Sequence, residues 1–272
     1  MRINYPNDVW RIRTSYRELD VEHDPGLGFT RRNGFRRLQP TITFAPRPGG
    51  FMRQIEFEVQ YEHLMDMDWN LETRKTDFKI FGLRFDSQDR LDFTVTQLFE
   101  RLEVADEFQI SDTITISAGR YNTWEWRLNG STASRRPVSV RGSIRGGEFW
   151  SGRRSGYNVN LTVRPKAGMS LGANYDRNNI SLPGGKFSTN LVRLEGGWHL
   201  SPWASFTGNV QYDDDSELVG LFARFRWIIR PGNDLFFVYT NNWLNEGDRL
   251  HDFDFTTVSR GASTKLNYTY RF

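Results

Sequence analysis

The fold is decided by a run of strictly alternating side chains, Gln54-Ile55-Glu56-Phe57-Glu58-Val59-Gln60-Tyr61-Glu62. Every second residue of this run is apolar or aromatic, and every residue between is polar or charged. A β-strand turns successive side chains to opposite faces, so the run predicts a strand with one apolar and one polar face. Runs of the same kind lie at 157–164, 192–200 and 219–230.

Similar runs recur along almost the whole chain, whereas helical periodicity is scarce. Their length of roughly 10–14 residues exceeds the ~5–6 residues of an ordinary globular strand and fits the tilted spans of an outer-membrane barrel. We expect about fourteen strands, within bounds of 12–16. They lie near residues 8–20, 35–46, 51–65, 73–85, 90–104, 119–130, 135–147, 154–165, 168–177, 187–200, 203–213, 217–230, 234–246 and 261–272.

The connections between these strands alternate in length. Tight turns of Gly, Pro, Asp and Ser are expected at 46–50, 86–89, 131–134, 165–168, 200–202 and 231–233. Longer links are expected at 21–34, 66–72, 105–118, 148–153, 178–186 and 247–260, and 105–118 has the pattern of an additional hairpin. This alternation is typical of an up-and-down antiparallel all-β barrel with short periplasmic turns and long external loops.

Composition excludes several other classes. The mean hydropathy is −0.62 and 25% of residues are charged, and no window approaches the ~18–20 apolar residues of a membrane helix. Aromatic residues make up 15% of the chain, which argues against disorder, and a formal net charge of +3 gives no reason to expect nucleic acid as a partner. Cysteine is absent, so a thiolate metal site and a cysteine nucleophile are excluded.

The last predicted strand supports the membrane interpretation. Leu266, Tyr268, Tyr270 and Phe272 alternate with polar residues, and Phe272 resembles the C-terminal assembly signal of bacterial outer-membrane barrels. We therefore expect residues 1–272 to form a single outer-membrane barrel domain. Its expected partners are the lipid bilayer, lipopolysaccharide and the outer-membrane assembly machinery.

The polar faces carry an arginine-rich set of charges that a closed barrel would direct into its lumen. The predicted lumen-lining residues are Arg11, Arg13, Glu56, Glu58, Glu62, Glu125, Arg127, Arg141, Arg145, Arg164, Arg193, Glu195, Arg224, Arg226 and Arg230. Two alternatives stay open. Either the lumen is a wet pore that favours small anionic or sugar solutes, or arginine and glutamate side chains pair into a plug.

Aromatic residues near the strand ends predict the girdles that mark the two membrane interfaces. The predicted girdle residues are Trp10, Trp124, Trp126, Trp198, Trp227, Tyr268 and Tyr270. Trp150 and Trp243 lie near loops, where a sugar-stacking platform is the alternative. Six arginines in or near the predicted outer loops could pair with lipid phosphates, although ordinary solvation of the loops is the simpler interpretation. They are Arg31, Arg32, Arg36, Arg153, Arg154 and Arg177.

Signals for an enzyme are thin. The four histidines have no zinc-site spacing, and no glycine-rich phosphate loop is present, so no catalytic residue, metal site or cofactor is predicted. Asp213-Asp214-Asp215 at a tight turn could hold calcium, although a solvated turn is the simpler interpretation. His251-Asp252-Phe253-Asp254 could act in acid–base chemistry, but no second carboxylate can be assigned to it.

Four stretches in order resemble the bacterial outer-membrane family catalogued as domain of unknown function 5916. They are Asp24-Pro25-Gly26-Leu27-Gly28-Phe29-Thr30-Arg31-Arg32, Gly147-Glu148-Phe149-Trp150-Ser151-Gly152, Ser181-Leu182-Pro183-Gly184-Gly185-Lys186-Phe187 and Arg230-Pro231-Gly232-Asn233-Asp234-Leu235-Phe236-Phe237-Val238-Tyr239. The resemblance implies the barrel-like C-terminal region of that family. It does not extend to the N-terminal module similar to carbohydrate-binding module family 9, so glycan binding by that module does not transfer to these residues.

The sequence thus predicts a passive or weakly selective pore in the bacterial outer membrane, or the membrane-anchoring barrel of a larger surface protein. The alternatives are a glycan-binding or glycan-processing surface protein that acts through its external loops, and a soluble all-β binding protein.

Overall fold

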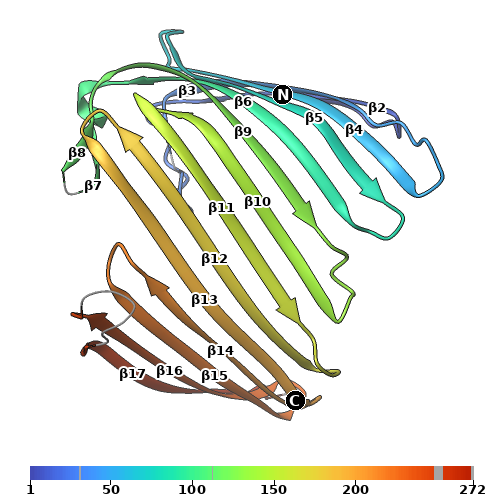
Figure 1. Ribbon diagram of the computed structural model, residues 1–272, viewed down its shortest axis with the longest axis vertical. Coiled ribbons are helices and arrows are strands. Elements are labelled where there is room, and N and C mark those ends of the chain that lie inside the picture. The colour runs from blue at the N-terminus through green and yellow to red at the C-terminus, as the bar shows by residue number, and fades with distance from the viewer. Residues whose placement is uncertain (31, 112, 248–253, 271–272) are drawn as a thin grey trace. The chain divides into compact units, whose positions relative to one another are not determined.

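The computed structural model describes residues 1–272 apart from 31, 112, 248–253 and 271–272. Fifteen strands form one antiparallel sheet in which they follow one another in chain order, and two short strands pair in a hairpin of their own (Figure 1). The strands of the large sheet are β1 (Arg2–Tyr5), β2 (Trp10–Leu19), β3 (Phe35–Phe44), β4 (Met52–Met65), β5 (Leu71–Phe85), β6 (Arg90–Leu102), β9 (Gly119–Ser131), β10 (Val138–Phe149), β11 (Gly152–Val163), β12 (Met169–Leu182), β13 (Gly185–Ser201), β14 (Ala204–Asp213), β15 (Leu218–Arg230), β16 (Asn233–Asn245) and β17 (Phe255–Asn267). The hairpin consists of β7 (Phe108–Ser111) and β8 (Ile114–Ile116), and it follows a single 3₁₀ turn, η1 (Val104–Asp106).

The predicted all-β, antiparallel, up-and-down fold is confirmed. Each of the fourteen predicted strands corresponds to one strand of the sheet, and the predicted extra hairpin at 105–118 is present as β7 and β8. β1 was not predicted, because a strand of four residues is too short to show a periodic pattern. The long links predicted at 148–153 and 178–186 are wrong, since the flanking strands continue until only residues 150–151 and 183–184 connect them.

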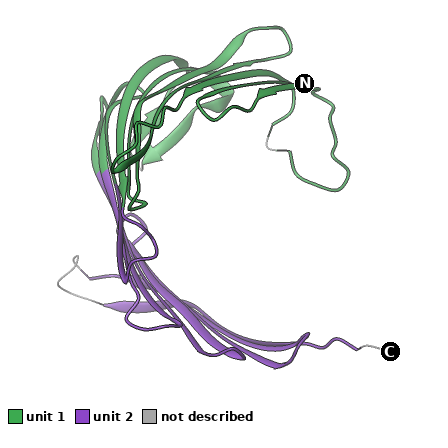
Figure 2. Ribbon diagram, turned by 90° about the vertical axis from the view of Figure 1, so that its right-hand side faces the viewer, with its two compact units in different colours: residues 1–131, 143–156, 179–187 green, residues 132–142, 157–178, 188–272 purple. Residues whose placement is uncertain are grey.

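The chain divides into two compact units (Figure 2). Unit 1 comprises Met1–Ser131, Ser143–Gly156 and Asn179–Phe187, and unit 2 comprises Thr132–Gly142, Tyr157–Asn178 and Ser188–Phe272. The residues of β10–β13 are divided between the two units, and the other strands of each unit pair with their neighbours in antiparallel register. Among the described residues, no helix is long and apolar enough to cross a membrane.

A β-bulge in β5 explains why its sequence alternates poorly. The register shifts between Lys79 and Phe81, which leaves Ile80 as an extra residue opposite β6. Before the bulge Phe78 pairs with apolar Val95, and after it Phe81 pairs with Phe93. One extra residue reverses the phase of the alternation, so odd-numbered and even-numbered apolar residues reach the same face.

β16 carries aromatic side chains on both of its faces. Phe237 pairs with Phe225 on the apolar face of unit 2, whereas Phe236 pairs with Arg226. The Arg226 guanidinium lies 5.6 Å from the centre of the Phe236 ring, a cation–π arrangement. A ring on the charged face is therefore covered by a cation.

The hairpin β7–β8 packs into the main hydrophobic cluster of unit 1. Ile114 and Ile116 of the hairpin are buried together with Leu182 of β12. The ring of Trp150 contacts this cluster and meets Phe108 edge-on, with ring centres 5.6 Å apart. The connection 103–118 is therefore held against the ends of neighbouring strands by apolar packing.

Candidate functional site

Polar side chains form continuous rows across the strands β2–β6 and β9 of unit 1. The register aligns Arg11, Thr43, Glu58, Lys79, Thr94 and Arg127 in one row, and Arg13, Thr41, Gln60, Asp77, Thr96 and Glu125 in the next. Successive cross-strand partners stand side by side on one face, so these rows make a continuous charged wall. We call this surface the polar face of unit 1.

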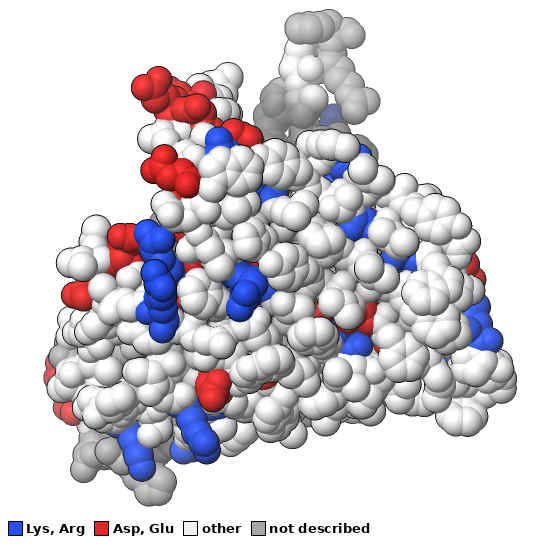
Figure 3. Space-filling view, turned by 90° about the horizontal axis from the view of Figure 1, so that it is seen from above, with Lys and Arg blue, Asp and Glu red and all other residues white. Residues whose placement is uncertain are grey.

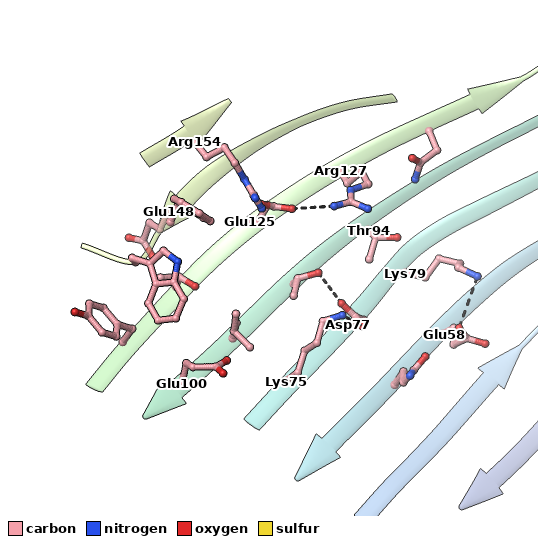
Figure 4. A pocket seen from close by; sticks show the side chains of 18 residues that line it. Glu58, Lys75, Asp77, Lys79, Thr94, Glu100, Glu125, Arg127, Glu148 and Arg154 are labelled. Carbon is pink, nitrogen blue, oxygen red and sulfur yellow. Dashed lines mark hydrogen bonds and ion pairs between the residues drawn. The ribbon is translucent and has the colours of Figure 1, made fainter. Parts of the chain in front are cut away.

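A cavity of about 530 Å³ lies on this polar face, which we call the wall pocket (Figure 4). It is lined by side chains of β4, β5, β6 and β9 together with residues from the β10–β11 corner. Five carboxylates and four cations border it, namely Glu58, Asp77, Glu100, Glu125 and Glu148 with Lys75, Lys79, Arg127 and Arg154. Tyr121, Phe149 and Trp150 supply an aromatic border.

Most of the charges in the wall pocket pair with neighbours in the wall. Glu125 accepts hydrogen bonds from Arg127, at 3.3 Å, and from Arg154 of β11 (Figure 4). On β5, the Lys75 ammonium lies 2.9 Å from a carboxylate oxygen of Asp77. These pairs run along the wall, so they neutralise charge within the surface that carries it.

Glu56 is the most buried carboxylate of the polar face, with an exposed fraction of 6%. Lys79 donates to it at 2.6 Å, Arg11 donates at 2.9 Å, and an Arg84 nitrogen lies at 3.8 Å. Removing a carboxylate from water is costly unless cations compensate it. Glu56 is therefore a structural centre that ties together three cations from β2 and β5.

Two carboxylates outside the strands have lowered pKa values. Asp66, in the 66–70 connection, accepts hydrogen bonds from the Asn70 side chain and from the backbone N–H groups of Asp68 and Asn70, each at 2.8 Å. The Asn70 side-chain bond is the largest cause that lowers the pKa of Asp66. The Arg47 guanidinium, 2.7 Å from Asp8, lowers the pKa of that carboxyl in the same way. Both groups are exposed, so they shape the connections rather than a buried reactive site.

The predicted lumen-lining residues are distributed over both units. In unit 1, Glu58, Glu125 and Arg127 border the wall pocket, Arg11 and Glu56 form an ion pair, and Glu62 accepts a hydrogen bond from Gln39. Arg13 belongs to the polar face as well, at the end of the second row. In β10, Arg145 directly follows exposed Ile144, so the alternation of the strand turns these two side chains to opposite faces.

In unit 2, the register places Arg193, Glu195, Arg224 and Arg226 between apolar rows. Arg193 donates to Gln211 at 2.9 Å, and Arg226 pairs with Asp234 at 2.9 Å. The remaining predicted residues occupy strand ends or β10: Arg141 lies in β10, Arg164 follows the last residue of β11, and Arg230 is the last residue of β15.

The opposite faces of the strands are apolar and exposed. In unit 1, one row consists of Ile12, Ile42, Val59, Phe78, Val95 and Trp126. In unit 2, an aromatic row consists of Trp198, Phe206, Phe225 and Phe237. Figure 3 shows one view of the surface, on which uncharged residues predominate and Lys, Arg, Asp and Glu are scattered among them.

The predicted girdle residues all lie among the exposed large side chains. Trp10, Trp124, Trp126, Trp198 and Trp227 are each between 41% and 50% exposed, and Tyr268 and Tyr270 follow the end of β17. Phe272 lies outside the described residues. Trp150 instead belongs to the packed cluster, where its ring centre lies 4.9 Å from that of Tyr121.

The remaining candidates from the sequence are a metal site, the aspartate turn at Asp213-Asp214-Asp215 and the stretch that begins at His251. No group of three or more His, Cys, Asp or Glu side chains within the described part of the chain could hold a metal ion. Asp214, in the aspartate turn, accepts a hydrogen bond from the Asn190 side chain, and the Asp215 N–H donates to Asp213 at 3.1 Å. His251 lies outside the described residues.

Three of the outer arginines form ion pairs with carboxylates. Arg32 pairs with Glu72, Arg36 with Glu18, and Arg154 with Glu125, so these three already have carboxylate partners. Arg31 lies outside the described residues. Sequence patterns could not reveal these pairs because each joins segments that are far apart in the chain.

No protein-family model matches the chain, and no curated protein matches it. The resemblance to the domain of unknown function 5916 family is therefore not confirmed. Comparison with solved structures finds bacterial porins, at low TM-scores. One is the NanC porin, at 12% identity and a TM-score of 0.30 over 73% of this chain and 94% of that one. Another is a mutant of the Rh. blastica porin, at 10% identity and a TM-score of 0.35 over 88% of this chain and 94% of that one.

Proposed function

We propose that this protein is a bacterial outer-membrane β-barrel that forms a passive or weakly selective pore. The observation that carries the proposal is the exposed apolar face of the strands, typified by Val59, which is 43% exposed in the middle of β4. Soluble monomers rarely expose contiguous apolar patches larger than a few hundred Å². Lipid is the solvent that matches such a face, while water matches the charged face behind it.

Strand length supports the same conclusion. The fourteen strands β2–β6 and β9–β17 contain 10 to 17 residues each. A tilted strand needs about 9–11 residues to span the hydrocarbon layer. Because lipid cannot satisfy unpaired backbone N–H and C=O groups, a spanning sheet has to close on itself. The proposed fold is therefore a closed barrel with the polar face of unit 1 in its lumen.

The pairing of charges on the polar face favours a wet pore over a plug. Glu125 pairs with Arg127 of its own strand and with Arg154 of β11, and Glu56 pairs with Lys79 of the adjacent strand β5. The side chains of both acids are therefore satisfied within the wall. A wall that neutralises itself leaves water free to fill the space in front of it. The remaining cationic positions would favour small anionic or sugar solutes. Service as the membrane anchor of a larger surface protein is compatible with the same barrel.

The proposed partners follow from the proposed location. The apolar faces require a lipid bilayer, and basic side chains at the strand ends suit the phosphates of lipopolysaccharide. The aromatic C-terminal pattern supports recognition by the outer-membrane assembly machinery, and membership of the domain of unknown function 5916 family belongs to the same proposal. A second function, glycan binding through the loops, has less support because Trp150 is engaged in packing.

Single-channel recording of the refolded chain in a planar bilayer tests the proposal. A heat-modifiability gel, in which a folded barrel migrates differently from the boiled chain, first establishes that the protein is folded. Stepwise openings whose conductance rises with salt concentration are expected for a pore. A folded, heat-modifiable protein that never conducts would overturn the pore, and a chain that stays monodisperse without detergent would overturn the membrane barrel.

A further inference from the structure

The polar face of unit 1 carries its charges unevenly. On β4–β9 acids and bases alternate and pair, as in the wall pocket. On β1–β3 the same face presents Arg2, Arg13, Arg17 and Arg37, which we call the arginine patch. Among the described residues, none of these four guanidinium groups forms an ion pair with a carboxylate.

The register gathers the arginine patch around Ser15. Arg13 and Arg17 lie two residues before and after Ser15 on β2, and Arg2 of β1 is its direct cross-strand partner. Arg37 lies diagonally across on β3, directly opposite Arg17. With a rise of about 3.4 Å per residue and about 4.5–5.5 Å between opposed Cα atoms, the four Cα atoms lie within about 8 Å of that of Ser15.

This arrangement has an electrostatic cost. Like charges directly opposite each other on neighbouring strands are destabilising, and Arg17 faces Arg37 in this way. The buried Nε atom of Arg37 has no hydrogen-bond partner. A cationic group of this kind, unpaired in a wall that elsewhere pairs its charges, is typical of a surface that receives an anion.

The neighbouring carboxylates do not relieve the repulsion. Glu62 shares the row of Ser15 through Gln39, and its carboxylate accepts a hydrogen bond from the Gln39 amide. Glu18 is on the other face of β2, where it accepts hydrogen bonds from Tyr16 and from Arg36. Both acids are therefore engaged by other groups.

Neutral hydrogen-bonding groups complete the surroundings of the arginine patch. A cavity of about 400 Å³ is bordered by Arg2 and Arg13 together with three hydroxyl and three amide side chains, and no acid borders it. These neutral residues are Asn4, Thr14, Ser15, Gln39, Thr41 and Gln60. A second cavity of about 570 Å³ shares Arg2, Ser15 and Gln39 with the first. It is also bordered by Arg17 and by Glu18, whose carboxylate accepts hydrogen bonds from Tyr16 and Arg36. The hydroxyl and amide groups can bond either the oxygens of an anion or the hydroxyls attached to it.

We propose that the arginine patch is a binding site for a small solute with at least two negative charges on phosphate or carboxylate oxygens. Planar guanidinium groups bind both kinds of oxyanion through paired N–H donors. Four of them around one serine provide more positive charge than a monovalent anion would neutralise. This proposal rests on the pore proposed above and names the class of solute that the pore would take. Binding itself requires only that unit 1 be folded.

Calorimetric titration of inorganic pyrophosphate into the refolded protein in an uncharged detergent tests the site. The test variant carries Arg13→Gln, Arg17→Gln and Arg37→Gln together. The matched control is Arg127→Gln, which removes a cation from the same face but from a position that is already paired with Glu125. Citrate, titrated in parallel, distinguishes a preference for phosphate from a preference for carboxylate oxygens.

We expect saturable binding by the wild type that weakens with added salt, since exposed charge pairs are screened. The triple variant is expected to bind at least tenfold more weakly, because each charge-assisted contact contributes about tenfold or more. The control should stay within about twofold of the wild type. If the triple variant fails to fold, Arg17→Gln alone serves, and it should be at least as stable as the wild type because it removes a repulsion.

Folded wild-type protein that does not bind pyrophosphate or citrate would overturn the site. Equal binding by the wild type and the triple variant, or equal loss in the control, would do so as well. Binding without channel openings would retain the site and refute the pore, whereas openings without binding would do the reverse. The two proposals therefore fail independently.

Discussion

A single lysine introduced on one face or the other of β4 tests whether the apolar face meets lipid. Val59 lies in the middle of β4 and belongs to the apolar row with Ile42 and Phe78. Gln60, the next residue, belongs to the polar row with Asp77. Val59→Lys and Gln60→Lys thus add the same side chain to the same strand, at adjacent positions but on opposite faces.

The expected magnitudes differ strongly between the two faces. A lysine on the lipid face of a barrel costs about 2–4 kcal/mol at the bilayer midplane and little near the interfaces. Val59 is the eighth of the fourteen residues of β4, so the midplane value applies. A cost of 2–4 kcal/mol lowers the ratio of folded to unfolded protein roughly 30- to 700-fold. Gln60→Lys places its ammonium beside the Asp77 carboxylate, and a change below about 1 kcal/mol is expected.

Equilibrium unfolding in urea, with both variants refolded into phospholipid vesicles, measures this difference. Tryptophan fluorescence reports the transition, and a heat-modifiability gel confirms the folded state at each end. Equal destabilisation by the two lysines would refute the assignment of faces. A neutral Val59→Lys would refute contact between this face and lipid, since a water-exposed valine tolerates the substitution.

Three further predictions concern buried charge, backbone shape and pH. Glu56→Gln leaves three partly exposed cations without their shared carboxylate, so we expect a loss of about 2 kcal/mol in the free energy of unfolding. For Arg127→Gln we expect a loss of less than about 1 kcal/mol. Urea unfolding compares the two variants, and equal losses would contradict the central role of Glu56. Gly147 has a φ of 146°, and a Cβ there would lie 2.2 Å from a backbone oxygen, so Gly147→Ala should destabilise the fold by about 3 kcal/mol or more. Gly130→Ala is the control, because a Cβ at Gly130 meets only ordinary contacts. The yield of heat-modifiable protein measures the effect on folding, and normal refolding of Gly147→Ala would refute the close approach. The pKa of Asp66 is lowered in the folded state, so its contribution to stability is present above the unfolded pKa and is lost as the pH falls through the folded pKa. In a profile of unfolding free energy against pH, Asp66→Asn should flatten the acid limb and leave the slope between pH 6 and 8 unchanged. An unaltered acid limb would contradict the lowered pKa of Asp66.

The local alternation of side chains was enough to predict most strands and both of their faces. In β4, Phe57 and Val59 alternate with Glu56 and Glu58, and the structure places the two pairs in separate cross-strand rows. This inference succeeds because the preference of a side chain for one face depends on its own polarity and on the two-residue period of a strand. Neither property requires knowledge of a distant partner.

Other features required the tertiary structure because they depend on register between strands. The sequence of β5 contains no mark that selects Ile80 as the bulged residue, and only pairing with β4 and β6 identifies it. The packing of Trp150 beneath the β7–β8 hairpin likewise joins segments that lie about forty residues apart in the chain.

The charged groups show the same division. Alternation placed Arg13 and Glu125 on one face, but only the structure showed that Glu125 pairs with two cations, whereas Arg13 forms no ion pair with a carboxylate among the described residues. Arg2 was overlooked because β1 is too short for a periodic pattern, and it joins the patch solely through its pairing with Ser15. The sequence by itself therefore determined which side chains share a face. Which charges meet was decided by cross-strand pairing, since an ion pair forms only between groups that the register brings within a few ångströms.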